Sequence, residues 1–85
     1  MIKLNQEDYK KEYRKYKLRV LSKTNGRDIH RLNGLLGIIL NQGLNYIYWE
    51  GKNKNKAEEI LKILKNTGKE IFHLTGVSFS LINQN

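Results

Sequence analysis

The first periodic pattern in the sequence covers residues 5–22. One apolar stripe recurs at intervals of four, three and four residues: Tyr9, Tyr13, Tyr16 and Val20. This spacing places the four side chains on one face of a helix. Asn5 stands at a favourable N-cap position, and Glu7 and Asp8 fall in the first turn, where the helix dipole favours acidic groups. We therefore predict a helix over residues 5–22.

A strand is the competing interpretation of part of this segment. Residues 15–20 alternate polar and apolar side chains, as a half-buried strand does. The helix is favoured over residues 15–21 because the tyrosine spacing begins earlier and no second strand lies nearby to pair with. Residues 22–26, which read Ser-Lys-Thr-Asn-Gly, then predict a turn.

A second helix is predicted over residues 27–48, with Thr24 or Asn25 as its cap. Its apolar positions are Ile29, Leu32, Leu36, Ile39 or Leu40, Gly43 and Ile47. At about 1.5 Å per residue, such a helix is about 33 Å long and would be the central element. Three glycines inside it disfavour a helix by about 0.8–1 kcal/mol each, which suggests a bend or the close approach of another backbone. They are Gly34, Gly37 and Gly43.

The third predicted helix begins with a capping-box pattern at residues 55–58. Its apolar positions are Ala57, Ile60, Leu61, Leu64 and Ile71. Residues 67–70 either interrupt this helix or cap a short last one, and Gly76 closes it. Residues 77–82 alternate and predict a strand or an extended tail. We predict one small basic domain over residues 1–85: mostly α, with three helices, a long central helix and a short extended C-terminal tail.

Composition adds a strong charge bias. The 85 residues include 16 Lys and Arg against 8 Asp and Glu, a formal net charge of +8. Ten of the basic and four of the acidic residues lie within residues 1–31. Such a balance favours a polyanionic partner or an acidic protein surface. The chain has no cysteine, which excludes disulfides, thiolate zinc sites and cysteine catalysis.

A membrane location is not expected. The start of the chain lacks the apolar segment of a signal peptide. Residues 32–49 are uncharged, which is close to the minimum for a membrane span. This segment contains four amides that would be costly to bury in lipid: Asn33, Asn41, Gln42 and Asn45. We expect a cytoplasmic protein.

The sequence offers little for catalysis. His30 and His73 are far apart and belong to no metal-binding spacing. Glu58 and Glu59 are adjacent, so they diverge on a helix and make a poor acid–base pair. Residues 67–69 look like the end of a phosphate loop but lack its earlier glycine and strand. We predict no enzymatic activity, no metal and no cofactor.

The basic residues of the first two predicted helices are the candidate nucleic-acid contacts. They are Lys10, Lys11, Arg14, Lys15, Lys17, Arg19, Arg27 and Arg31. Cations at helical spacing can follow the phosphates of DNA, although a solvated helix face has the same pattern. The tyrosines between them could stack on bases, but their stripe is more typical of core contacts.

The amides of the second predicted helix suggest a helix–helix interface. Asn41 and Asn45 are one turn apart, on the face that also carries Gly34 and Ile38. Amides can read adenine, but fixing the register between two helices is the favoured role. Apolar residues occupy nearly all sides of this helix, more than two flanking helices can cover. We therefore predict a homodimer built around Gly34, Ile38, Asn41 and Asn45.

The segment at residues 36–45 resembles part of the plasmid mobilisation proteins of the MobC type. The positions that carry this likeness are Gly37, Leu40, Asn41, Gln42 and Asn45, and with the following charged loop and helix it covers about residues 29–74. The resemblance implies an accessory protein of the plasmid relaxosome, which binds near the origin of transfer and helps a relaxase to open the duplex. Two features depart from the family: it has polar residues where Ile38 and Ile39 stand, and a longer ribbon-helix-helix-like N-terminal region.

Two functional hypotheses follow. The first is a non-enzymatic DNA-binding protein of a mobile genetic element, acting as a homodimer. The alternative is a phage- or plasmid-encoded inhibitor, of the anti-CRISPR or replication-inhibitor type, that binds an acidic nucleic-acid-binding groove of a host protein.

Overall fold

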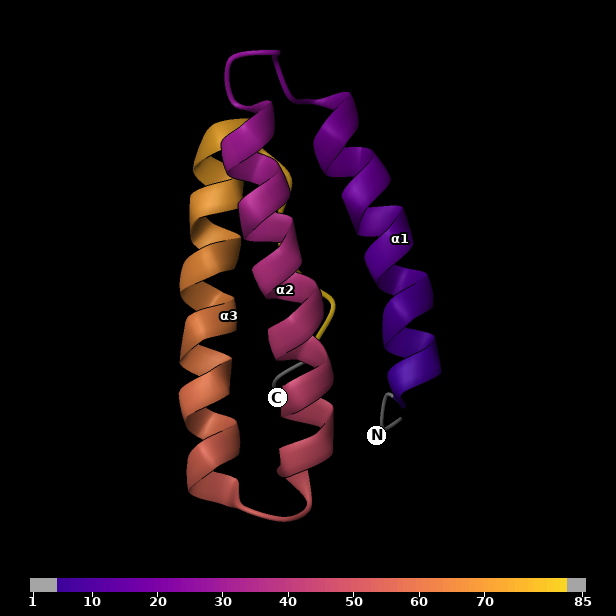
Figure 1. Cartoon of the computed structure of the whole chain (residues 1–85), viewed down its shortest axis with the longest axis vertical. Coiled ribbons are helices and arrows are strands. Elements are labelled where there is room, and N and C mark those ends of the chain that lie inside the picture. The colour runs from indigo at the N-terminus through magenta and orange to yellow at the C-terminus, as the bar shows by residue number, and fades with distance from the viewer. Residues whose placement is uncertain (1–4, 83–85) are drawn as a thin grey trace.

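The computed structural model describes residues 5–82, which form three helices and an extended tail (Figure 1). The helices are α1 (Gln6–Ser22), α2 (Ile29–Glu50) and α3 (Lys54–Thr75). No strand occurs within residues 5–82. The prediction of a mostly α, three-helix domain with an extended C-terminal tail is confirmed.

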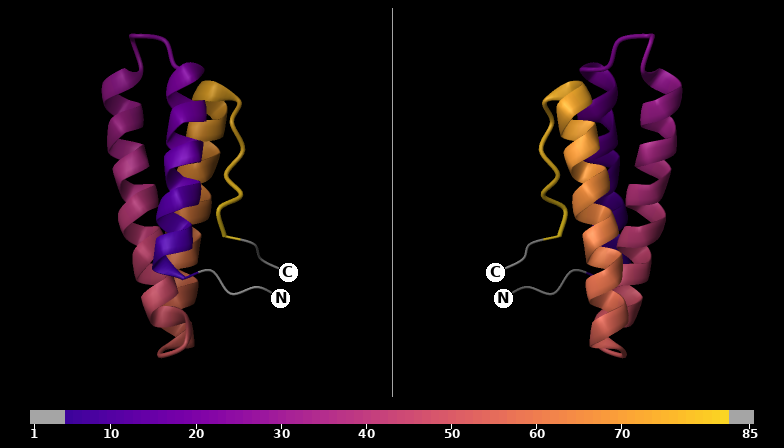
Figure 2. Two further views of the ribbon diagram at one scale, coloured as in Figure 1. Left: turned by 90° about the vertical axis from the view of Figure 1, so that its right-hand side faces the viewer. Right: turned by 90° about the vertical axis from the view of Figure 1, so that its left-hand side faces the viewer.

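The three helices form an elongated bundle of 40 × 21 × 20 Å. α2 and α3 make an antiparallel hairpin, and α1 packs beside α2 (Figure 1). After α3, the chain turns back and runs along the side of the bundle opposite α2, as the two side views of Figure 2 show. One side of α2 is therefore left without a covering element among the described residues.

The helix starts are set by asparagine side chains. Asn5 caps α1 as predicted, because its Oδ1 accepts a hydrogen bond from the Asp8 amide at 2.8 Å. The predicted cap of α2 is wrong: Asp28 occupies the N-cap position without a side-chain bond. Asn25 instead closes the preceding turn by accepting from the amides of Arg27 and Asp28.

The predicted start of α3 is also wrong, by two residues. Asn53 is its N-cap and accepts from the Lys56 amide at 3.2 Å, so the helix begins at Lys54, before the pattern at residues 55–58. The helix then runs unbroken through residues 67–70, where an interruption was predicted. Gly76 ends it as predicted, with φ of 79° and its amide donating to the Phe72 carbonyl at 2.7 Å. This left-handed conformation suits glycine.

The tyrosine stripe of α1 lies in the core, as predicted, together with Val20. The Tyr9 hydroxyl donates to the Ile39 carbonyl at 2.6 Å, and the Tyr13 hydroxyl donates to the Leu36 carbonyl at 3.0 Å. Both bonds tie α1 to the backbone of α2. The Tyr16 hydroxyl is buried and has no hydrogen-bond partner within the described part of the chain.

Gly43 explains how closely α1 approaches α2. A Cβ atom at this position would lie 2.0 Å from the Tyr9 ring and hydroxyl. The predicted close approach of another backbone is therefore wrong at Gly43, where the close neighbour is a side chain, the Tyr9 ring. Gly34 and Gly37 differ, because a Cβ atom at either position would meet no atom within 4 Å.

The tail, residues 77–82, completes the core from the side opposite α2. Val77 and Leu81 are buried and Phe79 is partly buried, whereas Ser78 and Ser80 are exposed. The alternation predicted for this segment thus reflects an extended chain with one face on the helices. The Phe79 ring meets the Tyr16 ring edge-to-face, with 5.8 Å between centroids.

The hydroxyl groups of Tyr13 and Tyr16 lie in different environments, and this difference predicts opposite effects of a Tyr→Phe substitution at the two positions. Tyr13→Phe should destabilise the fold by about 1 kcal/mol, because a buried hydrogen bond is lost. Tyr16→Phe should be neutral or stabilise by up to about 1 kcal/mol, because it removes a buried hydroxyl that has no partner. Urea unfolding of both variants beside the unmodified protein checks this contrast. Equal destabilisation by the two substitutions would contradict it.

The same burial predicts a loss of stability at high pH. Burial raises the pKa of Tyr16 to about 12 and that of Tyr9 further above its ordinary value of 10.0. In the unfolded chain these tyrosines ionise from about pH 10 upward, whereas in the folded chain they stay protonated. The free energy of unfolding therefore has its full value below pH 10 and falls as pH rises beyond it. At pH 11 the free energy of unfolding should fall by about 1 kcal/mol for each of the two tyrosines. Urea unfolding at pH 8 and pH 11 measures the fall, which should be smaller in the Tyr16→Phe variant.

Candidate nucleic-acid interface

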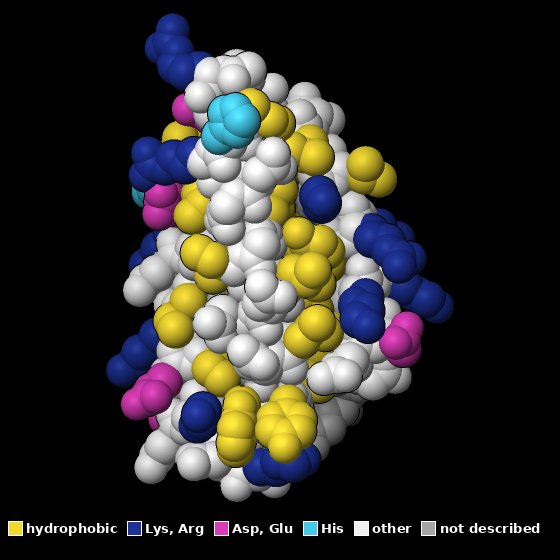
Figure 3. Space-filling view, in the orientation of Figure 1, with side chains coloured by type: hydrophobic (Ala, Val, Ile, Leu, Met, Phe, Trp, Pro, Cys, Tyr) yellow, Lys and Arg dark blue, Asp and Glu magenta, His cyan; other side chains and the backbone are white. Residues whose placement is uncertain are grey.

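The outer face of α1 carries six of the predicted nucleic-acid contacts. Because the tyrosine stripe faces the core, Lys11, Arg14, Lys15, Lys17 and Arg19 are exposed, and Lys10 is partly exposed. Lys10, Arg14 and Lys17 follow at intervals of four and three residues, so they form one row along the helix. In Figure 3, basic side chains line the edge of the molecule over α1, beside the outer face of α2.

Ion pairing leaves most of these charges available. Lys10 lies 3.7 Å from Glu7 and Lys15 lies 3.4 Å from Glu12, both within α1 and both solvent-exposed. Such pairs contribute about 0–1 kcal/mol and are easily exchanged for another anion. Across residues 5–82, no carboxylate pairs with the remaining four cations of the helix. These are Lys11, Arg14, Lys17 and Arg19, which we call the free α1 cations.

The other two predicted contacts lie outside this surface. Arg27 is exposed in the turn between α1 and α2. Arg31 is held against α3, because its Nε donates to Glu70 Oε2 at 2.8 Å and its terminal nitrogen pairs with the same oxygen. The structure therefore spreads the six α1 residues over the exposed part of one helix, with Lys10, Arg14 and Lys17 in one row, and separates Arg31 from them.

The four residues of the predicted dimer interface lie on the outward side of α2. Gly34, Asn41 and Asn45 are exposed, and Ile38 is 39% exposed. The Asn45 amide donates to Gln42 Oε1 at 3.5 Å, within the same helix. We call Gly34, Ile38, Asn41 and Asn45 the α2 stripe. In Figure 3, pale polar and glycine surface runs down the middle of this face, with apolar side chains on both sides.

The segment at residues 36–45 lies wholly inside α2. Its amides point outward or are partly buried, and Leu40 packs against the core. No family model, curated protein or solved structure matches this chain. Residues 15–21 are helical, so the helical interpretation of that segment is confirmed and it offers no ribbon strand.

Sequence reasoning missed one cluster of aromatic and basic side chains, at the turn between α2 and α3. The Lys52 ammonium lies 4.5 Å from the centre of the Tyr48 ring, and the Lys56 ammonium lies 4.6 Å from that of Trp49. The two rings meet edge-to-face at 5.0 Å. The sequence carries a signal for this cluster, because Tyr48 and Trp49 are adjacent and lysines follow them. Lys52 comes four residues after Tyr48, and Lys56 comes seven residues after Trp49. Because each lysine covers one ring, the cluster first of all stabilises the turn.

Neither a membrane-spanning helix nor a metal-binding group of side chains is found within residues 5–82. Among the helices of residues 5–82, none has both the length and the hydropathy that crossing a bilayer requires. Within the same residues, no three His, Asp or Glu side chains gather into a group that could hold a metal ion.

Proposed function

We propose that this protein is a non-enzymatic DNA-binding protein of a mobile genetic element, such as a plasmid mobilisation accessory protein. The observation that carries the proposal is the outer face of α1. Four cations on one rigid helix have no carboxylate partner within residues 5–82, and two more form only weak surface pairs. Cations without a carboxylate partner break no ion pair when they contact phosphates. Their binding is also favoured by the entropy of the counterions released from DNA.

The phosphate backbone is the part of DNA that this surface suits. Lysine and arginine side chains on a helix can follow a line of phosphates without reading bases. Leu18 is 70% exposed among the free α1 cations and can make apolar contact in a groove. Contact with phosphates alone predicts strong salt dependence and weak sequence preference.

A homodimer is the second part of the proposal. The α2 stripe carries no charge in a protein of net charge +8, so two copies can meet there with little repulsion. Gly34 and Gly37 have open space where a Cβ would be, which allows the backbone of a second helix to come close. Ile38, within the α2 stripe, is 39% exposed, and Tyr48, beside the stripe, is 50% exposed. Pairing through α2 would set two basic α1 helices on one assembly.

The dimer predicts a specific effect of charge in the α2 stripe. Asn41→Asp should weaken association by several kcal/mol, because two like charges would be buried together. Asn66→Asp, a matched change at an exposed position of α3, should leave association unchanged. Sedimentation equilibrium at about 100 μM measures both variants, a concentration that populates dimers with micromolar dissociation constants. A monomer of 10.0 kDa in the unmodified protein would contradict the dimer.

Fluorescence anisotropy with labelled DNA tests the proposed function. Duplex and single-stranded oligonucleotides are titrated with the full chain at about 50 mM and about 200 mM salt. Four phosphate contacts predict that affinity for duplex falls by about 100-fold between these concentrations. The absence of binding at the lower concentration, or affinity that does not respond to salt, would overturn the proposal.

Inhibition of a host protein is the second candidate function. It is favoured by the exposed apolar residues Ile38 and Tyr48 on an uncharged face, which suits contact with a protein more than with DNA. A pull-down from nuclease-treated host lysate separates the two functions. A stoichiometric protein partner that survives nuclease supports inhibition, whereas loss of all partners supports DNA binding.

A further inference from the structure

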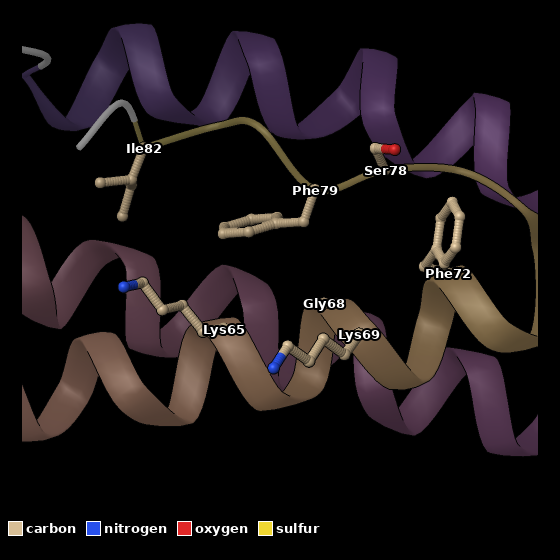
Figure 4. A pocket seen from close by; sticks show the side chains of 7 residues that line it. All are labelled: Lys65, Gly68, Lys69, Phe72, Ser78, Phe79 and Ile82. Atoms are coloured by element: carbon tan, nitrogen blue, oxygen red, sulfur yellow. The ribbon is translucent and has the colours of Figure 1, made fainter. Parts of the chain in front are cut away.

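A pocket lies between α3 and the tail, on the side of the bundle opposite α2. Its volume is about 430 Å³, and it is lined by Lys65, Gly68, Lys69, Phe72, Ser78, Phe79 and Ile82. Figure 4 shows Phe79 and Ile82 reaching down from the tail, Lys65 and Phe72 rising from α3, and Lys69 lying along the helix. A volume within roughly 300–1,000 Å³ is the usual size for a small-molecule site.

The pocket results from how the tail is anchored. Val77 and Leu81 are buried in the core and hold the tail at two points. Between them, Phe79 passes directly over Gly68, where a Cβ atom would lie 2.7 Å from the Phe79 Cβ. Gly68 therefore lets the tail pack closely on α3 at Phe79, and the pocket is the space left around this contact.

The lining combines apolar walls with two positive charges. Phe72, Phe79 and Ile82 supply the apolar surface, and Phe72 remains 47% exposed. Lys65 and Lys69 are one helical turn apart, and across the described residues neither forms an ion pair. No acidic side chain lines the pocket. Such a site fits a ligand with an apolar body and an anionic end.

We propose that this pocket binds a free medium-chain fatty acid or a similar single-chain carboxylate. The acyl chain lies against Phe72, Phe79 and Ile82, and the carboxylate meets Lys65 and Lys69. This site is separate from the outer face of α1, so the proposal goes beyond DNA binding and does not depend on it.

Calorimetric titration of the full chain with sodium decanoate, below its micelle concentration, tests the site. Affinity should rise by about threefold to fourfold per added methylene from hexanoate to decanoate, the increment expected for burial of each group. Decanol should bind at least about tenfold more weakly, because charge-assisted contacts are lost. Decyltrimethylammonium should not bind. Equal binding of the cationic amphiphile, or affinity that is independent of chain length, would overturn the proposal.

Variants locate the binding in this pocket. The double variant Lys65→Gln, Lys69→Gln should lower decanoate affinity about tenfold and leave decanol binding unchanged. Lys62→Gln, at an exposed lysine of α3 outside the lining, is the matched control and should change neither. Phe72→Ala should weaken both ligands several-fold, whereas Ile63→Ala, at a similarly exposed apolar residue, should not. Loss of affinity in the control variants as well would contradict this assignment.

Amide chemical shifts give a readout that is independent of affinity. Decanoate should move the amide signals of Gly68 and Ser78, which lie on opposite sides of the pocket. The amides of the free α1 cations should not respond. Shifts that are confined to the α2 face would place the ligand elsewhere and overturn the proposal. The DNA titrations use a different surface, so either proposal can fail without the other.

Discussion

Gly43→Ala is expected to destabilise the protein by about 2–6 kcal/mol. The added methyl group would lie 2.0 Å from the fully buried Tyr9 ring, so α1 has to move away from α2. Overpacking costs about 1–3 kcal/mol, and loss of the Tyr9 hydrogen bond to the Ile39 carbonyl adds about 1–3 kcal/mol. A small domain is stable by only a few kcal/mol, so most of its molecules should be unfolded or partly open near physiological temperature.

Two further variants show whether the collision is the cause. Gly37→Ala has open space for its methyl group and should stabilise the helix by up to about 1 kcal/mol. Adding Tyr9→Leu to Gly43→Ala removes the ring that collides. The double variant should then be about 2 kcal/mol more stable than the sum of the single effects predicts. Thermal and urea unfolding measure the unmodified chain, the single variants Gly43→Ala, Gly37→Ala and Tyr9→Leu, and the double variant. A Gly43→Ala variant as stable as the unmodified chain would contradict the packing described.

Replacing the four free α1 cations by glutamine should nearly abolish DNA binding at moderate salt. Removing four phosphate contacts should reduce the slope of log affinity against log salt by about 3–4 and weaken binding by about 100-fold or more at 100 mM salt. All four side chains are exposed, and glutamine is a good helix former, so the fold should remain intact. Anisotropy titrations at several salt concentrations measure both quantities.

The matched control removes the same charge from another helix. Four exposed lysines of α3 can be changed to glutamine together: Lys54, Lys62, Lys65 and Lys69. If DNA binds the outer face of α1, this variant should keep most of its affinity. Equal losses in the two variants would mean that net charge, and not the α1 surface, determines binding.

The helices could be predicted because their patterns are local. The tyrosine stripe of α1 and the capping role of Asn5 depend on residues within two turns of each other. The start of α3 was misplaced because Asn53 and Asn55 are both good caps, and local preference does not choose between them. The continuity of α3 at Gly68 was missed because the reason for that glycine is Phe79, which approaches it from the tail.

The candidate sites were less predictable because they depend on distant contacts. The spacing of Lys10, Arg14 and Lys17 was enough to place them in one row on α1. The pairing of Arg31 with Glu70 joins two helices and removes Arg31 from the basic surface, and no local pattern indicates it. The pocket depends on the path of the tail after Gly76, which alternation alone left open between a strand and an extended segment.

The position of the tail has a consequence for the order of events during synthesis. α1 leaves the ribosome first, but its inner face is closed by Val77, Phe79 and Leu81 near the other end of the chain. At about 5–20 residues per second, the tyrosines of α1 wait several seconds for these partners. The α2–α3 hairpin can form before then, since its contacts are between neighbouring elements. The core is therefore sealed only after α3 and the tail have been synthesised, and during that interval α1 is the part of the nascent chain that chaperones can reach.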